Sequence, residues 1–195
     1  MKLTRTQENI LKAARGLFLS KGYPTTTVDE IVDKAGVSKG SFYHAFPSKE
    51  DMGVVLLDWY QRGGEQQFLN GPFAKMEDPK KRMFAYLDHI ENVSKELWSH
   101  GCLLGTLGLE LAETSPKIRK KISKIFKGLI KSLEPIFEPA GKNNGAKGHP
   151  SAREIAEGFL ITMEGAIMLV RVNKDWNYFS RGMQNFRNHL NHLSN

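Results

Sequence analysis

Cysteine is almost absent from this chain of 195 residues, which contains only Cys102. A lone cysteine excludes a disulfide within the chain, so we expect a reducing, cytoplasmic location. No apolar run reaches the length of about 18 residues needed to span a bilayer, because Glu157 and Glu164 interrupt residues 155–172. Charges are spread over the first residues, so we expect neither a signal peptide nor a membrane partner.

The chain also lacks the patterns that catalysis and cofactors usually require. It has no second cysteine, no HExxH pair and no glycine-rich phosphate loop. Glu110 with Glu113, or His100 with Cys102, could be drawn as metal ligands, but a site needs about four well-spaced donors. We therefore expect no enzyme activity, no cofactor and no metal.

The charge of the chain is predominantly positive. A formal net charge of +7 favours polyanionic partners, although charge alone does not separate nucleic acid from a membrane surface. Residues 117–131 carry lysine or arginine on one side of a predicted helix and contain no acid. This basic face is either simply solvated, or it is a second phosphate-binding surface or attracts an acidic ligand.

Apolar residues recur at spacings of three and four along most of the chain, which is typical of amphipathic helices. We therefore predict an all-α protein. Glycine, proline and capping residues place helices over residues 4–21, 27–35, 38–46, 48–69, 79–99 and 102–113, with further starts at Pro116, at Ser151 and after Asp175. Residues 139–150, rich in glycine, asparagine and lysine, predict a loop.

Residues 27–49 contain the most specific local pattern. Thr27 with Glu30 three residues later predicts a capping box, and Gly36 predicts that the helix ends in the left-handed conformation. Ser38 then predicts the N-cap of a second short helix. Two short helices joined by a glycine-containing turn form a helix-turn-helix.

The second of these helices has one side suited to DNA. Phe42 and Phe46, four residues apart, predict its buried edge. Small and hydrogen-bonding groups at the front of such a helix can enter the major groove, while hydroxyl, imidazole and ammonium groups can meet phosphates. The predicted DNA contacts are Ser38, Lys39, Gly40 and Ser41 in the groove and Tyr43, His44 and Lys49 at phosphates. Thr26 and Thr27 either bind a phosphate or only cap the helix.

The run TTVDEIVDKAGVSKGSFYHAFPSKEDM resembles the DNA-binding motif of the TetR family of one-component repressors. Val32 stands where that family usually has alanine, and Met52 where leucine is usual. The resemblance implies a DNA-binding domain over residues 1–47 and an effector-binding and dimerisation domain over residues 48–195. The two apolar helices at the end of the chain independently suggest a homodimer formed as a four-helix bundle.

An effector pocket inside the second domain is the predicted sensing site. Aromatic and methionine side chains at helical spacing are core residues by default, and the sequence does not choose among them. The candidates are Trp59, Phe84, Leu87, Leu103, Leu107, Phe126, Phe159 and Met163.

Cys102 is a sharper candidate for a sensor. At a helix start and beside His100, its thiolate fraction would rise, making it a target for electrophiles. The segment HGCLLGTLGLELAETSPKIRKKI resembles a TetR branch with a GCL motif, which includes repressors that respond to electrophiles through this cysteine. Thr106 stands where that branch often has asparagine. The alternative is a buried thiol that fills apolar space.

We therefore predict a dimeric, sequence-specific regulator that a small molecule or a reactive electrophile releases from a palindromic double-stranded operator. Two alternatives come from other classes. A DNA-packaging protein would use the basic face and bind any sequence with a steep salt dependence. A helical enzyme using Cys102 would turn over an electrophile.

Overall fold

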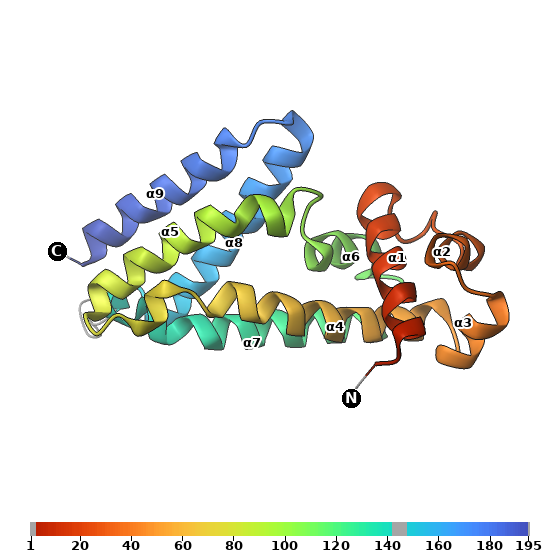
Figure 1. Cartoon of the computed structure of the whole chain (residues 1–195). Coiled ribbons are helices and arrows are strands. Elements are labelled where there is room, and N and C mark those ends of the chain that lie inside the picture. Colours follow the sequence, from red (N-terminus) through yellow and green to blue (C-terminus); the bar gives the residue numbers. More distant parts are fainter. Residues whose placement is uncertain (1–2, 142–147, 195) are drawn as a thin grey trace. The chain divides into compact units, whose positions relative to one another are not determined.

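The structure is a computed structural model that describes residues 3–141 and 148–194, with the backbone alone for residues 65–67. Within these residues it contains α-helices, one short 3-10 helix and no strand, which confirms the all-α prediction (Figure 1). The elements are α1 (Arg5–Lys21), α2 (Val28–Ala35), α3 (Lys39–Ala45), α4 (Lys49–Leu69), η1 (Pro72–Lys75), α5 (Pro79–Trp98), α6 (Leu103–Leu111), α7 (Pro116–Gly141), α8 (Ala152–Asn173) and α9 (Asn177–Leu193).

Local capping explains where most of these helices begin. Thr4, Thr27 and Ser151 each form a capping box with the residue three positions later, so two backbone N–H groups find acceptors at each start. Asp78 accepts hydrogen bonds from the N–H groups of Lys80 and Lys81 at the start of α5. These starts lie where the sequence predicts them.

Two predicted boundaries differ from the structure. Helix α7 continues through Pro139 to Gly141, because Phe137 and Ala140 are buried there and packing outweighs the cost of proline. The loop predicted from residue 139 is thus wrong for residues 139–141, and residues 142–147 lie outside the described part. Asp175 accepts a hydrogen bond from the N–H of Asn177, 3.0 Å away, but the N-cap of α9 is Trp176.

The chain divides into two compact units. The first contains Met1–Arg62 with His100–Lys124, so α6 and the first turns of α7 share a unit with the three N-terminal helices. The second contains Gly63–Ser99 with Ile125–Asn195. This division describes packing, and the predicted functional boundary after residue 47 stays a prediction.

Each unit has its own apolar core. In the first, α1 packs on α2, α3 and α6 through side chains that include Ile10, Phe18 and Ile31, which are fully buried. In the second, α8 and α9 run side by side and α5 packs against α9 (Figure 1). No helix in the described part of the chain combines the length and apolar character needed to cross a membrane.

Candidate nucleic-acid interface

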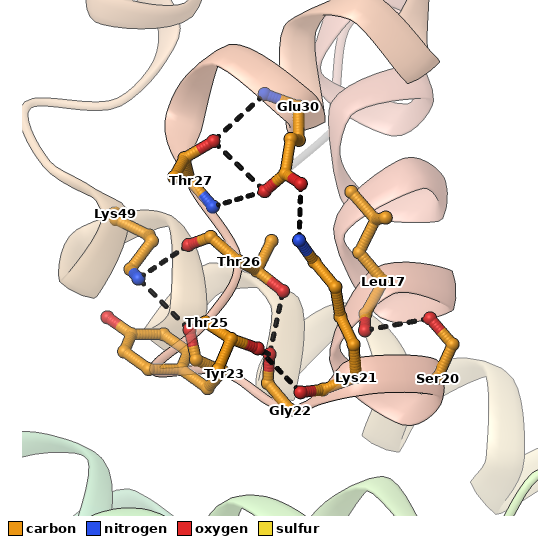
Figure 2. Close-up of polar contacts among 10 residues, drawn as sticks. All are labelled: Leu17, Ser20, Lys21, Gly22, Tyr23, Thr25, Thr26, Thr27, Glu30 and Lys49. Atoms are coloured by element: carbon orange, nitrogen blue, oxygen red, sulfur yellow. Dashed lines mark hydrogen bonds and ion pairs between the residues drawn. The ribbon is translucent and has the colours of Figure 1, made fainter.

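The start of α2 is held by a network that couples it to α1. The N–H of Glu30 donates to Thr27 Oγ1 at 3.2 Å, and the N–H of Thr27 donates to Glu30 Oε2 at 2.8 Å. Lys21 forms an ion pair with the same carboxylate (Figure 2). The bond from Lys21, and then those from Thr27, lower the pKa of Glu30 to about 2. The predicted capping box is therefore confirmed.

The turn between α2 and α3 depends on one glycine. Gly36 has φ 65° and ψ 39°, the left-handed conformation that glycine adopts at little cost. Its N–H donates to the carbonyl of Asp33 at 3.2 Å, and the N–H of Val37 donates to that of Val32 at 3.1 Å. This pair of bonds is a Schellman motif, which closes α2 and redirects the chain into α3.

Helix α3 has one buried and one exposed side. Ser38 is its N-cap and accepts a hydrogen bond from the N–H of Ser41 at 3.1 Å. Phe42 is 0% exposed and Phe46 is 2% exposed, so these rings anchor α3 as the sequence predicts. We call the predicted DNA-contacting residues of this helix the outer face of α3. They are Ser38, Lys39, Gly40, Ser41, Tyr43 and His44.

This outer face is chemically suited to a polyanion. All of its residues are exposed except Ser41, which is half-buried, and the first turn of α3 contains no acid. Lys39 pairs with Asp29 of α2 at 2.8 Å, which raises the pKa of Lys39. Tyr43 remains 51% exposed although its ring contacts Phe42 edge to face.

Thr26 and Lys49 instead make internal hydrogen bonds at the turn between α1 and α2. The Thr26 side chain is 1% exposed, and its hydroxyl donates to the carbonyl of Gly22 at 2.7 Å. Lys49 Nζ donates to the carbonyls of Thr26 and Tyr23, at 2.8 and 3.1 Å (Figure 2). This geometry supports a structural role for both residues, and their contact with DNA stays a prediction.

Burial changes the pKa values of Lys49 and Tyr23 at this turn. Lys49 Nζ also lies 4.2 Å from the centre of the Tyr23 ring, a cation–π contact. Burial lowers the pKa of Lys49, while burial and the nearby Glu50 raise the pKa of Tyr23 to about 12. The Tyr23 hydroxyl therefore stays neutral at physiological pH.

Cys102 lies at a helix start, as the sequence predicts. It is the N-cap of α6, is 6% exposed and forms no disulfide. Burial restricts the access of reagents to the thiol. Its role as a sensor stays a prediction.

The other predicted effector residues fall in both units. In the first unit Leu103 and Leu107 are buried and Trp59 is half-buried. In the second unit Leu87, Phe159 and Met163 are buried, whereas Phe84 and Phe126 are half-buried. Within the residues that the structure describes, no group of three or more histidine, cysteine, aspartate or glutamate side chains could hold a metal.

The sequence prediction named Phe159 but missed the aromatic cluster around it in the second unit. Tyr86 of α5 lies at its centre, and the surrounding rings come from α4, η1, α7 and α8. The Tyr86 cluster, as we define it, contains Phe68, Phe73, Tyr86, Phe137 and Phe159. A signal for it existed, because Tyr86 follows Met83 by three residues and so shares the apolar stripe of α5.

A capped helix-turn-helix at the front of a larger helical chain defines the class of helix-turn-helix DNA-binding proteins. Comparison with known families agrees. Residues 10–53 match the model described as "Bacterial regulatory proteins, tetR family", and residues 79–184 match "Transcriptional regulator LmrA/YxaF-like, C-terminal domain". The second match covers more than half of the chain, which therefore belongs to the TetR family of transcriptional regulators.

Individual relatives agree with this assignment. The chain is 28% identical over 177 residues to an HTH-type transcriptional regulator in the lacX 3' region of Lactococcus lactis subsp. lactis, covering 90% of the chain and 88% of the relative. It is 29% identical over 148 residues to the HTH-type transcriptional repressor NemR of Escherichia coli (strain K12), covering 74% and 70%. The crystal structure of regulatory protein TetR from Rhodobacter sphaeroides matches with TM-score 0.80 and 25% identity, over 95% of this chain and 99% of that one.

The chain is thus a DNA-binding transcriptional regulator of the repressor class. Regulators of this family act by binding DNA and are not enzymes, so the comparisons argue against a thiol-dependent enzyme. The comparisons also favour a regulator over a DNA-packaging protein. Dimers and effector-binding domains are typical of the family.

Proposed function

We propose that this regulator binds a palindromic operator as a homodimer through the outer face of α3, and that an effector acting on the rest of the chain lowers its DNA affinity. The observation that carries the proposal is α3 itself, anchored by two buried phenylalanines with its polar side left exposed. Because its operator would be bacterial DNA, we expect the protein to act in the cytoplasm. The effector needs only a few kcal/mol of differential affinity between DNA-binding and released states.

Different residues of the outer face have different proposed roles. Lys39 and Ser41, near the front of α3, are assigned to base edges in the major groove, and Tyr43 and His44 to phosphates. Base contacts carry sequence information, whereas phosphate contacts position the protein on any duplex. The two groups of variants should therefore behave differently.

Selection of binding sites from random oligonucleotides tests these roles. We expect Tyr43→Ala to weaken binding to all sequences by a similar factor, and Lys39→Ala or Ser41→Ala to change the preferred base at one position of each half-site. Lys12→Ala, at an exposed position of α1 outside the predicted contacts, is the control. Equal behaviour of the two groups would contradict the assignment, and the absence of any preferred sequence would contradict the function.

We propose α8 and α9 as the dimer interface. Large apolar side chains are exposed along α8, including Ile161 (74%) and Val172 (73%) together with Met168 and Leu169. A groove of about 420 Å³ lies between α8 and α9, with Gly158 and Gly182 among its lining residues. An exposed apolar row beside such a groove fits the packing of a second pair of helices.

A single acidic substitution in this row tests the interface. Ile161→Glu or Val172→Glu should yield monomers in sedimentation and lose most operator affinity, because one α3 reads only half of a palindrome. Asn92→Glu, at an exposed position of α5, adds the same charge elsewhere and should leave the dimer intact. Dimers that persist in both α8 variants would show that the interface lies elsewhere.

Cys102 is the proposed point of attack for reactive effectors. Its thiolate would form a C–S bond with one carbon of the double bond of a maleimide. A proton from water would then add to the other carbon. Helix α6 carries Cys102 at its start and packs on α1 within the same unit, so a modification there can disturb the DNA-binding helices. If Cys102→Ser still released operator DNA normally on addition of N-ethylmaleimide, this role would be wrong.

A further inference from the structure

Tyr86 presents a buried hydroxyl without a partner. The side chain is 0% exposed, and its Oη makes no hydrogen bond within the described residues. Phenylalanine would fill the same space without leaving a polar group unpaired, so the buried hydroxyl carries a cost in stability. Burial raises the pKa of Tyr86 well above its usual value, which keeps the hydroxyl protonated and therefore a donor.

The ring of Tyr86 packs among other aromatic rings. The Tyr86 ring centre lies 5.1 Å from that of Phe73 and 5.6 Å from that of Phe159. The rings of Phe68 and Phe137 are 5.9 and 6.0 Å away, both nearly perpendicular to it. All of these residues belong to the second unit and none is charged. Such a lining favours a flat, uncharged ligand, because a charge would lose its hydration without gaining a counterion.

One ring of the Tyr86 cluster comes from a short element that packs on α5. Phe73 is the one buried residue of η1, a 3-10 helix of four residues whose other side chains are exposed. Moving this ring aside disturbs a single short turn, whereas Phe137 and Phe159 lie inside long helices. Phe73 is therefore the ring that an entering ligand can displace with the least disruption.

We propose that the Tyr86 hydroxyl is the hydrogen-bond donor of an effector site in this cluster, and that the site takes an uncharged aromatic molecule carrying one acceptor, such as an aryl ketone. The ligand binds without being oxidised or reduced, and it forms no covalent bond with the protein. It supplies the acceptor that Tyr86 lacks and fits among the surrounding rings. The proposal rests on the proposed function, since it names the class of effector for the second domain.

Acetophenone and ethylbenzene test the site, because they share a phenyl ring with a two-carbon side chain and differ in the carbonyl oxygen. Dissociation constants are measured by calorimetry and ligand-detected NMR on the full-length protein without DNA. We expect Tyr86→Phe to weaken acetophenone about tenfold, the effect of one lost hydrogen bond, and to leave ethylbenzene within about twofold. Tyr178→Phe removes a hydroxyl from a half-buried tyrosine of α9 and should change neither.

Three outcomes overturn the proposal. They are the failure of both probes to bind the wild-type protein at millimolar concentration, equal weakening of both probes by Tyr86→Phe, and unchanged acetophenone binding in that variant. Tyr86→Phe keeps the ring and removes an unpaired group, so its melting temperature should equal or exceed that of the wild type.

The same experiment separates this site from the proposed function. Probe binding is measured without DNA, so its failure would leave selection of an operator by the outer face of α3 untouched. Conversely, a protein that binds acetophenone but prefers no DNA sequence would retain the site and lose the proposed regulatory role. An aryl ketone does not alkylate thiols, so Cys102 does not contribute to either readout.

Discussion

Glu110, near the end of α6, accepts a hydrogen bond from the backbone N–H of Tyr23, 87 residues earlier in the chain, at 2.8 Å. Tyr23 belongs to the turn between α1 and α2, whose carbonyl groups also bind Lys49. One carboxylate thus joins α6 to the turn that leads into the helix-turn-helix. Cys102, the proposed sensor, is the N-cap of the same helix.

We expect Glu110→Ala to destabilise the first unit and weaken operator binding. The substitution leaves the half-buried N–H of Tyr23 without its acceptor, which should cost about 1–2 kcal/mol and lower the melting temperature by several degrees. Glu110→Gln keeps a side-chain oxygen and should retain most of the stability. Thermal unfolding and DNA titration measure both effects. Glu113→Ala, at an exposed position just beyond α6, is the control, and losses as large in that variant would contradict a specific role for Glu110.

Gly22 is required both by its backbone and by the approach of Glu110. Its φ is 90°, and a Cβ atom built there would lie 2.6 Å from Glu110 Oε1. Gly36 also has a positive φ, but a Cβ there meets nothing within 4 Å. We therefore expect Gly36→Ala to cost about 1 kcal/mol and Gly22→Ala at least about 2 kcal/mol, as measured by denaturant unfolding.

A double-mutant cycle separates the two causes at Gly22. In the Glu110→Ala background the clash is absent and only the backbone strain remains, so Gly22→Ala should cost less there than in the wild type. Equal costs in the two backgrounds would show that the carboxylate does not constrain the turn.

The helix-turn-helix could be predicted from sequence because its determinants are local. Thr27, Glu30, Gly36 and Ser38 each act on backbone groups within a few residues, and the structure places all four in their predicted roles. Lys49 shows the limit of such reasoning, since its carbonyl partners lie 23 and 26 residues away and follow from tertiary packing. The Tyr86 cluster was missed for the same reason, because its rings come from five separate elements.

The capping box of α2 should contribute to stability in a way that depends on pH. The pKa of Glu30 falls from 4.5 to about 2, chiefly through its bond with Lys21. Because the folded-state pKa is depressed, the stabilisation is present above about pH 4.5 and is lost as the pH falls toward 2. We therefore expect the stability difference between wild type and Glu30→Gln to shrink over this interval, measured by urea unfolding at a series of pH values.

Removing the partner of Glu30 provides the control. Lys21→Met should raise the pKa of Glu30, followed by NMR titration of its carboxyl carbon, and shift the loss of stability toward higher pH. A pKa of Glu30 that is the same in wild type and Lys21→Met would contradict the assigned cause.

Glycine at position 40 should lower the stability of α3 but favour binding to the operator, and one substitution can separate the two effects. It lies in α3 at an exposed position, and an added Cβ would come no closer than 3.8 Å to Ser38 Oγ, so the fold does not require glycine there. Gly40→Ala should stabilise the protein by up to about 1 kcal/mol through helix propensity.

On the outer face of α3, however, the added methyl group would meet the floor of the major groove, so we expect operator affinity to fall about tenfold, a loss of about 1.4 kcal/mol. Gly128→Ala, at an exposed position of α7 where a Cβ meets nothing within 4 Å, should stabilise similarly and leave DNA binding unchanged. Unaltered affinity in Gly40→Ala would mean that this part of α3 does not approach the bases.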